Sequence, residues 1–257
     1  IKYNLWFKNH NKFNYRIKTT MSEKFNKIYD KSIKDPEKFW QEASENIFWF
    51  KKPSKILNKS NPPFYRWYED GVTNTCYNAL DIHIDQGKGD KTALIYDSPI
   101  TGYKKKFSYK ELKSKVSKFA GALQDQGVNK GDRVIIYMPM IPEAVVAMLA
   151  CARIGAIHSV VFGGFASNEL ASRIDDSKAK LLVTASCGFE PGRTVEYKPL
   201  VDEAVKQAQH KISKMILFQR QGHEVKLNAP LEISWDEANT NAKDTDCVEM
   251  NSNEFAY

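Results

Sequence analysis

Residues 132–186 read DRVIIYMPMIPEAVVAMLACARIGAIHSVVFGGFASNELASRIDDSKAKLLVTAS, and this stretch decides the fold. Three short runs rich in Val, Ile and Leu, at residues 132–138, 156–162 and 180–186, alternate with two segments of helical periodicity. Short apolar strands separated by helices are typical of a parallel sheet covered on both faces. The sequence therefore predicts a doubly wound α/β fold.

The same alternation continues on both sides of this stretch. A helical pattern at residues 199–209 is followed by an apolar strand at residues 214–220. Upstream, Ser108 and Glu111 have the spacing of a capping box, which predicts a helix that ends near Gly127. A hairpin with Gly102 in its turn precedes that helix. We expect a mostly parallel sheet flanked by helices.

The amino-terminal part has a different character. Asp35 followed by Pro36 predicts a capped helix that runs to residue 47, and a second short helix is expected at residues 75–84, closed by Gly87. The aromatic residues between them predict an ordered loop, because the rings at positions 64, 65, 67 and 68 favour burial. This is a helical and loop-rich extension.

Three regions follow from these patterns. We expect a basic leader at residues 1–34, an amino-terminal segment at residues 35–90, and the first part of a larger α/β domain at residues 91–257.

Charge is distributed unevenly along the chain. The formal net charge of the 257 residues is +7, but residues 1–60 hold 14 lysine and arginine residues against 6 acids, and the remainder holds 24 against 25. The main body is therefore neutral, and no basic groove for nucleic acid is indicated. No apolar run approaches the roughly 20 residues that a membrane span needs, so neither nucleic acid nor membrane is an expected partner.

The four cysteines, Cys76, Cys151, Cys187 and Cys247, lack the spacing of a metal site or a disulfide framework. We expect no metal ligands, a reducing compartment, and core or loop positions for Cys151 and Cys187.

The first twenty residues contain five lysine and arginine residues and no acid. This favours a mitochondrial presequence, although translation from Met21 is an alternative. The expected location is therefore the mitochondrial matrix, and the alternative is the cytoplasm.

Two glycine-containing loops follow consecutive strands. The first is Phe162, Gly163 and Gly164, and the second is Glu190, Pro191, Gly192 and Arg193. Ligands of open α/β sheets bind beyond the carboxyl ends of strands. Because glycine has no Cβ, a ligand can approach its backbone closely, and the Arg193 guanidinium can donate two parallel hydrogen bonds to a phosphate. Together the loops therefore predict a site for a phosphorylated ligand. The alternative for Gly163 and Gly164 is an ordinary turn.

Two nucleotide signatures are absent. The first strand of the regular region runs into YMPMIPEA without the G-x-G-x-x-G pattern, and no G-x-x-x-x-G-K-[ST] occurs anywhere. A Rossmann dehydrogenase and an ordinary P-loop enzyme are therefore disfavoured.

Residues 137–186 closely resemble the short-chain acyl-CoA synthetases, the acetyl- and propionyl-CoA synthetase branch of the adenylate-forming superfamily. The resemblance extends more loosely over residues 35–257, and DPEKFWQEASENIFWFKKPSKIL looks like the segment that precedes the AMP-binding domain in that branch. EPGRTVEYKPLVDEAV and YEDGVTNTCYNALDIHID look more like the propionyl-CoA synthetases.

The resemblance implies a reaction in two steps. A short carboxylate and ATP give an acyl-adenylate and pyrophosphate, and the thiol of coenzyme A then displaces AMP. It also implies that Phe162, Gly163 and Gly164 and the loop from Glu190 to Arg193 lie against coenzyme A. Acetyl-CoA synthetases usually carry an arginine where this chain has Glu190, which leaves Arg193 as the matching phosphate ligand.

The family's phosphate loop, its Mg²⁺ contacts and its catalytic lysine would lie beyond residue 257. No residue here is therefore assigned as catalytic or as a metal ligand, and the chain alone is predicted to be inactive. The expected partners are small molecules: a short-chain carboxylate, ATP and coenzyme A. The predicted activity is that of a propionate–CoA ligase. The alternatives are an acetate–CoA ligase and a non-catalytic fragment that acts only as a binding module.

Overall fold

The computed structural model describes residues 23–257. The chain forms two compact units, Ile1–Asn46 and Ile47–Tyr257. In the first unit, helices α1 (Glu23–Lys34) and α2 (Pro36–Ser44) are joined by an ion pair between Lys31 and Glu42. Asp35 caps α2 as predicted, since its side chain accepts a hydrogen bond from the Lys38 amide at 3.1 Å. The helix ends at Ser44 rather than at residue 47.

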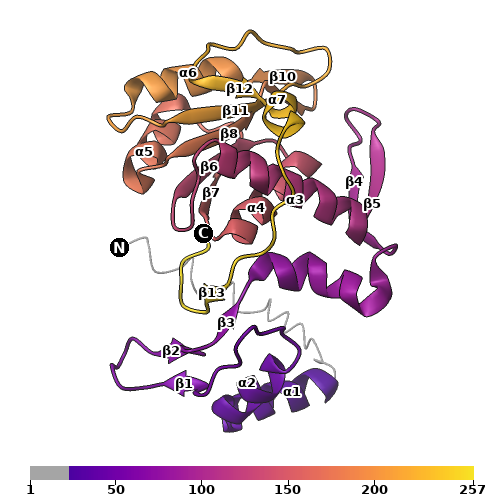
Figure 1. Ribbon diagram of the computed structural model, residues 1–257, viewed down its shortest axis with the longest axis vertical. Coiled ribbons are helices and arrows are strands. Elements are labelled where there is room, and N and C mark those ends of the chain that lie inside the picture. The colour runs from indigo at the N-terminus through magenta and orange to yellow at the C-terminus, as the bar shows by residue number, and fades with distance from the viewer. Residues whose placement is uncertain (1–22) are drawn as a thin grey trace, which may run out of the picture. The chain divides into compact units, whose positions relative to one another are not determined.

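A five-stranded parallel sheet organises the second unit, with the strand order β12-β11-β8-β6-β7 (Figure 1). Its strands are β6 (Arg133–Met138), β7 (Ile157–Phe162), β8 (Leu181–Ala185), β11 (Lys214–Phe218) and β12 (Glu232–Ser234). The four strands predicted from the apolar runs are confirmed. The short edge strand β12 has only three residues and was not predicted.

Helices cover both faces of this sheet. They are α3 (Tyr109–Asp125), α4 (Pro142–Ile154), α5 (Ser167–Ser177), α6 (Tyr197–Gln207) and α7 (Trp235–Thr240). Alternate residues of β6 belong to separate cores: Val134 and Ile136 pack with residues of α3 and α4, while Ile135 packs with residues of α5 and α6. The doubly wound α/β fold is confirmed.

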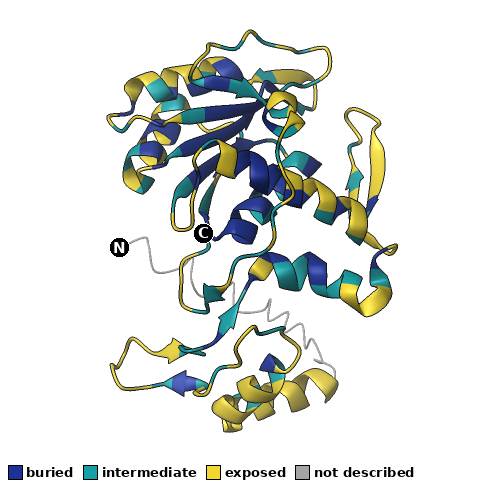
Figure 2. Cartoon of the chain, in the orientation of Figure 1, coloured by how far each residue is buried: buried dark blue, intermediate teal, exposed yellow. Residues whose placement is uncertain are grey.

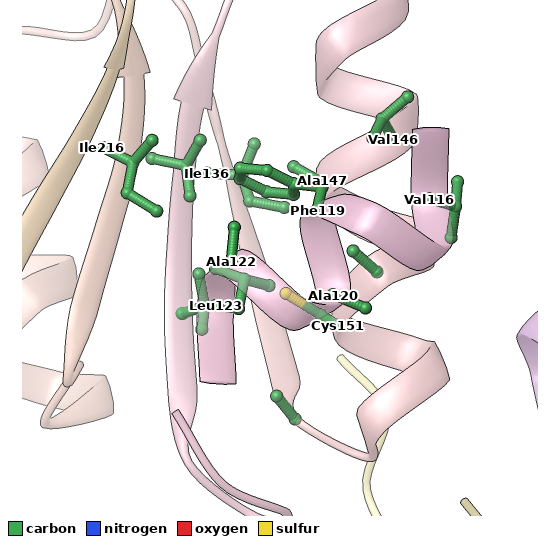
Figure 3. Close-up of a cluster of buried hydrophobic side chains, with 14 of the residues drawn as sticks. Val116, Phe119, Ala120, Ala122, Leu123, Ile136, Val146, Ala147, Cys151 and Ile216 are labelled. Carbon is green, nitrogen blue, oxygen red and sulfur yellow. The ribbon is translucent and has the colours of Figure 1, made fainter. Parts of the chain in front are cut away.

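The larger core lies between the sheet and α3, α4 and α7. Its buried side chains include Phe119, Ile136 and Ile216, whose arrangement can be followed in Figure 3. The Phe119 ring stacks on the Trp235 ring with 3.7 Å between centroids, which joins α7 to α3. Strands β6, β8 and β11 and the inner faces of these helices are the most continuously buried parts of the described chain (Figure 2).

The hairpin and the capping box are also confirmed. Strands β4 (Thr92–Asp97) and β5 (Lys104–Ser108) pair antiparallel, with Gly102 at positive φ between them. The Ser108 hydroxyl accepts from the Glu111 amide at 3.2 Å, and the Glu111 carboxylate accepts from the Ser108 amide at 2.8 Å. This reciprocal pair begins α3.

The amino-terminal extension differs from expectation in two respects. Phe64 and Tyr65 are 75% and 52% exposed, so their expected burial was wrong. They precede β2 (Arg66–Trp67), which pairs only with β1 (Leu57–Asn58). Such a two-stranded ribbon has no second layer to cover them.

The second difference concerns the short helix. It consists largely of two π-helical segments, Tyr77–Asp81 and Ile84–Lys88, whereas Gly87, at a φ of 75°, breaks the helical geometry where the sequence predicted the helix to close. Beyond it, β3 (Val72–Thr73) pairs antiparallel with β13 (Met250–Asn251).

A strap formed by residues 241–249 crosses the surface of α3. The Thr245 amide donates to the Ser117 hydroxyl at 2.9 Å, and that hydroxyl donates to the Thr245 carbonyl at 2.8 Å. A Cβ on Gly121 would lie 1.9 Å from the Lys243 carbonyl oxygen, so the strap can cross here only because α3 has a glycine.

A buried polar cluster anchors the strap at α4. The Arg153 side chain, 1% exposed, donates to both oxygens of Asp81 at 2.8 and 3.0 Å and to the sulfur atoms of Cys247 and Cys76 at 3.1 and 3.5 Å. Cys76, Asp81 and Cys247 thus meet although their spacing gave no sign of it. Because Arg153 already pairs with the carboxylate and contacts both sulfurs, the cluster is explained without a cation.

Candidate functional site

Three loops converge beyond the carboxyl edge of the sheet. The strand order makes β6 the first strand, with β7 on one side and β8 on the other, which defines a topological switch point. The segments around the ends of β6, β7 and β8 line a cavity of about 350 Å³, whose remaining wall comes from the end of β4 with the turn after it, from Tyr197 and from Arg220. This is the location at which open α/β sheets bind ligands.

The structure brings the two predicted loops together. Phe162, Gly163 and Glu190 line the cavity. Gly164 lies beside it, at a φ of 118°, and a Cβ there would lie 4.0 Å from a Glu190 carboxylate oxygen and near no other atom. The loops therefore face each other across the Glu190 side chain.

The outer part of the second loop lies apart from this cavity. Residues 187–196 form an antiparallel hairpin of β9 (Cys187–Glu190) and β10 (Arg193–Glu196), with Pro191 and Gly192 exposed in its turn. The Arg193 guanidinium, 70% exposed, binds the Glu190 carboxylate with nitrogen–oxygen distances of 2.6 and 2.7 Å. The hairpin was not predicted from the sequence, which read this segment as a loop.

Gly163 has a structural reason to lack a side chain. A Cβ on Gly163 would lie 2.3 Å from the Tyr197 hydroxyl, and a Cβ on Gly188 would lie 2.7 Å from the same atom. The first residue of α6 thus packs its ring between the loop after β7 and the hairpin after β8. The space at Gly163 is filled by Tyr197, whereas the space at Gly164 is open.

Tyr137 of β6 forms hydrogen bonds with the same loop after β7. Its hydroxyl donates to the Phe165 carbonyl at 2.9 Å and accepts from the Gly164 amide at 3.3 Å. Its ring centroid is 5.0 Å from that of Tyr197. Burial raises the pKa of Tyr137, and burial followed by the neighbouring Tyr137 raises the pKa of Tyr197 to about 12, so both hydroxyls stay protonated donors at neutral pH.

Ser186 connects the next strand to this arrangement. Its carbonyl accepts from the Tyr197 amide at 3.0 Å, and its hydroxyl accepts from the Arg220 amide at 2.8 Å. Arg220 therefore has a fixed backbone position beyond β11, and its guanidinium lies 4.7 Å from the centroid of the Phe189 ring.

A second cavity, of about 580 Å³, adjoins the first. Both are lined by Tyr96, Ile141, Phe189 and Arg220. The second cavity also carries Lys105, Lys115 and Glu143, and burial raises the pKa of Glu143. The sequence gave no signal for this cavity, because its lining comes from the β4–β5 hairpin, α3, α4 and β11.

Helix α5 begins at Ser167, directly after the first loop, and its capping residue Ala166 makes no side-chain capping hydrogen bond.

Comparison with known proteins agrees with this fold. The chain belongs to the AMP-binding enzyme family, which matches residues 82–257, and the acetyl-coenzyme A synthetase amino-terminal family matches residues 25–79. Within the AMP-binding enzymes, its relatives are short-chain acyl-CoA synthetases.

Two of these relatives are similar over most of this chain. The human mitochondrial acyl-CoA synthetase short-chain family member 3 is 54% identical over 88% of this chain and 33% of its own length. The acetyl-coenzyme A synthetase of Streptomyces avermitilis is 45% identical over 81% of this chain and 32% of its own length. The chain therefore spans about a third of the length of these curated relatives.

The acetoacetyl-CoA synthetase of Streptomyces lividans has the same fold, with a TM-score of 0.77 over 87% of this chain and 34% of that one, at 22% identity. In residues 23–257, none of the helices has the length and apolar character that crossing a membrane requires.

Proposed function

We propose that this sequence belongs to an acid–thiol ligase that converts a short-chain carboxylate, ATP and coenzyme A into acyl-CoA, AMP and pyrophosphate. The observation that carries the proposal is the convergence of Phe162, Gly163 and Glu190 on one cavity at the switch point of the sheet. Relatives named as acyl-CoA synthetases support the reaction class.

Within this proposal, coenzyme A lies against the loop from Phe162 to Gly164 and the hairpin turn from Glu190 to Arg193. The open space at Gly164 supports the approach of a ligand to the backbone there. The rim also carries hydroxyl and guanidinium donors that suit phosphate and amide oxygens. ATP, with Mg²⁺, is the other substrate, and no residue of this chain is assigned to it.

The 257-residue chain alone is proposed to bind coenzyme A without performing adenylation. It spans about a third of the length of its relatives, and none of its residues is assigned to the adenylation step. Pyrophosphate release from ATP and propionate should therefore be absent with this chain. It should appear when the sequence is extended through the remaining length of its relatives.

Propionate is the proposed acyl donor, with acetate as the alternative, because the EPGRTVEYKPLVDEAV segment resembles propionyl-CoA synthetases. One methylene in an apolar pocket changes the rate by roughly 10- to 200-fold. The ratio of kcat/KM for propionate and acetate in the extended protein tests this choice. A ratio that favours acetate would overturn it.

If the loop from Phe162 to Gly164 contacts coenzyme A, a change in this loop should affect the step that uses coenzyme A and not the first step. Gly164→Val in the extended protein should raise the KM for coenzyme A while pyrophosphate release in the first step stays unchanged. An unchanged coenzyme A requirement would contradict the assignment. A binding module without catalysis is the second candidate, and it predicts no acyl-CoA from any extended form.

We also propose a mitochondrial location. The human relative is named as mitochondrial, and the acid-free basic character of residues 1–20 is typical of a presequence. Cell fractionation together with mass spectrometry of the mature amino terminus tests it. A protein that retains Met21 or Ser22 as its first residue in the cytoplasmic fraction would contradict it.

A further inference from the structure

Arg193 is the cation that the sequence assigns to a phosphate, but its guanidinium is already engaged. Its Nε and Nη2 atoms both contact the same Glu190 oxygen, at 2.7 and 2.6 Å. A phosphate would have to compete with this carboxylate, and it would meet the negative charge of Glu190 on approach. The Arg193 side chain also lies outside the lining of the 350 Å³ cavity.

Arg220 has the opposite properties. It is the one lysine or arginine that lines the 350 Å³ cavity within the described part of the chain. The two carboxylates of that lining have cations of their own, because Asp97 pairs with Lys104 at 2.8 Å and Glu190 pairs with Arg193. Among residues 23–257 the Arg220 guanidinium has no ion-pair or hydrogen-bond partner.

The position of Arg220 leaves its donors available. The guanidinium carbon of Arg220 lies 4.7 Å from the centroid of the Phe189 ring, and the Ser186 hydroxyl accepts a hydrogen bond from the Arg220 backbone amide at 2.8 Å. A cation–π contact uses the charge of the guanidinium and needs none of its five N–H donors as hydrogen-bond partners. The N–H groups of the Arg220 guanidinium therefore have no partner among the described residues. Two such parallel N–H donors are the arrangement that binds phosphate oxygens.

Balancing the charge of Glu143 does not explain Arg220. Glu143 lines the second cavity together with Arg220, Lys105 and Lys115, but no ion pair within 4.0 Å joins it to Arg220. Burial raises the pKa of Glu143, which favours its neutral form and reduces its need for a counterion. Among residues 23–257, no carboxylate thus forms an ion pair with Arg220, and its donors are free for an anionic ligand.

We propose that Arg220, which contacts the Phe189 ring and lines both cavities, binds the phosphates of the nucleotide end of coenzyme A. The proposal rests on the proposed function, and it assigns the main cationic contact to a residue beyond β11 rather than to the Glu190–Arg193 turn. The aromatic residues of the adjoining cavity, Tyr96, Tyr103 and Phe189, suit the purine ring that accompanies those phosphates.

Calorimetric titration of the 257-residue chain tests this inference with two ligands. Coenzyme A carries the nucleotide phosphates, and pantetheine carries the thiol arm without them. Arg220→Gln should weaken coenzyme A binding by roughly 10- to 100-fold, the range for a lost hydrogen-bonded ionic contact. Pantetheine binding should change less than about twofold, since no phosphate is present. Arg220→Lys, which keeps the charge but loses the fork, should fall between the two.

Arg173→Gln is the matched control, because it removes the same charge from an exposed position on α5 outside both cavities. Circular dichroism melting of each variant reports whether the fold is retained. If Arg220→Gln does not fold, the comparison of Arg220→Lys with the unmodified chain decides instead.

The possible outcomes separate the two proposals. If the unmodified chain binds coenzyme A and Arg220→Gln binds it equally well, the Arg220 assignment is overturned and the proposed function stands. An equal loss for coenzyme A and pantetheine also overturns the assignment, because it indicates a structural role. If the unmodified chain binds neither ligand, both proposals fail.

Discussion

The Tyr197 hydroxyl occupies the position next to Gly163 that a side chain would need, 2.3 Å from an ideal Cβ. The same hydroxyl lies against Gly188 on the facing hairpin. Tyr197 is thus the residue that sets the separation of the two loops at the proposed site. Because Tyr197 is the first residue of α6, the position of this helix on the sheet determines where the tyrosine ring contacts both loops.

The first prediction follows from this contact. Gly163→Ala should destabilise the protein by about 1–3 kcal/mol, because an added methyl overpacks the Tyr197 ring. Tyr197→Phe removes the nearest atom, so the double variant should be less destabilised than the sum of the two single variants. Urea unfolding of the four proteins measures this coupling. Strictly additive free energies of unfolding would contradict the contact.

A second prediction concerns the strap at residues 241–249. Gly121→Ala places a methyl group within 1.9 Å of the Lys243 carbonyl oxygen, which is backbone and cannot rotate away. The strap should lift from α3 and lose the paired hydrogen bonds between Ser117 and Thr245. Hydrogen exchange of the Thr245 amide should become faster. Gly121→Ala with unchanged protection at Thr245 would show that the strap is placed differently.

The third prediction concerns the buried ion pair. Asp81→Asn leaves the Arg153 guanidinium buried without its counterion and should cost about 3–5 kcal/mol at neutral pH. The matched change Asp90→Asn affects a carboxylate that is 89% exposed and should cost no more than about 1 kcal/mol. Urea unfolding at pH 7 compares them. Equal costs for the two variants would contradict the assigned burial.

The same pair should make stability depend on pH in a defined direction. Burial alone would raise the pKa of Asp81, but the hydrogen bond and charge of Arg153, together with Lys113, outweigh it and leave the pKa lowered. A lowered carboxyl pKa contributes stability that is present above the unfolded value of about 3.9 and is lost as the pH falls through the folded value. The difference in free energy of unfolding between the original chain and Asp81→Asn should therefore become smaller only on acidification. A gap that widens on acidification would contradict this sign.

Much of this fold could be predicted from local pattern. The strands at 132–138, 156–162 and 180–186 and the Ser108 capping box depend on residues close in sequence, so periodicity and spacing identify them. Strand β12 was missed because three residues carry too little pattern. The hairpin at 187–196 was read as a loop because its Pro-Gly turn dominated the local signal.

The candidate site could be predicted only in part. The positions of the glycine loops follow from the rule that ligands bind beyond the carboxyl ends of strands. The packing of Tyr197 against Gly163 and the open guanidinium of Arg220 depend on which strands become neighbours. No local pattern encodes that adjacency. The meeting of Cys76 with Cys247 was hidden for the same reason.

A further prediction concerns Glu190, whose carboxylate binds the Arg193 guanidinium. Glu190→Gln removes a negative charge from the cavity and releases the Arg193 guanidinium, whose two contacts it now holds. Coenzyme A should therefore bind about two- to tenfold more tightly, in line with the strength of a charge-assisted contact near the surface. Calorimetric titration measures the change. Weaker binding by the variant would indicate that Glu190 itself contacts the ligand.

The most direct test of the account is a titration of the nitrogen-15-labelled chain with coenzyme A, followed through its glycine amide resonances. We predict saturable shifts at Gly163, Gly164 and Gly192, in the two loops beyond the carboxyl edge of the sheet. Gly131 and Gly155, which precede β6 and β7 at the opposite edge, should stay unchanged. Saturable shifts at Gly131 and Gly155 without any at Gly163 and Gly164, or no saturable shift at all, would contradict the central claim.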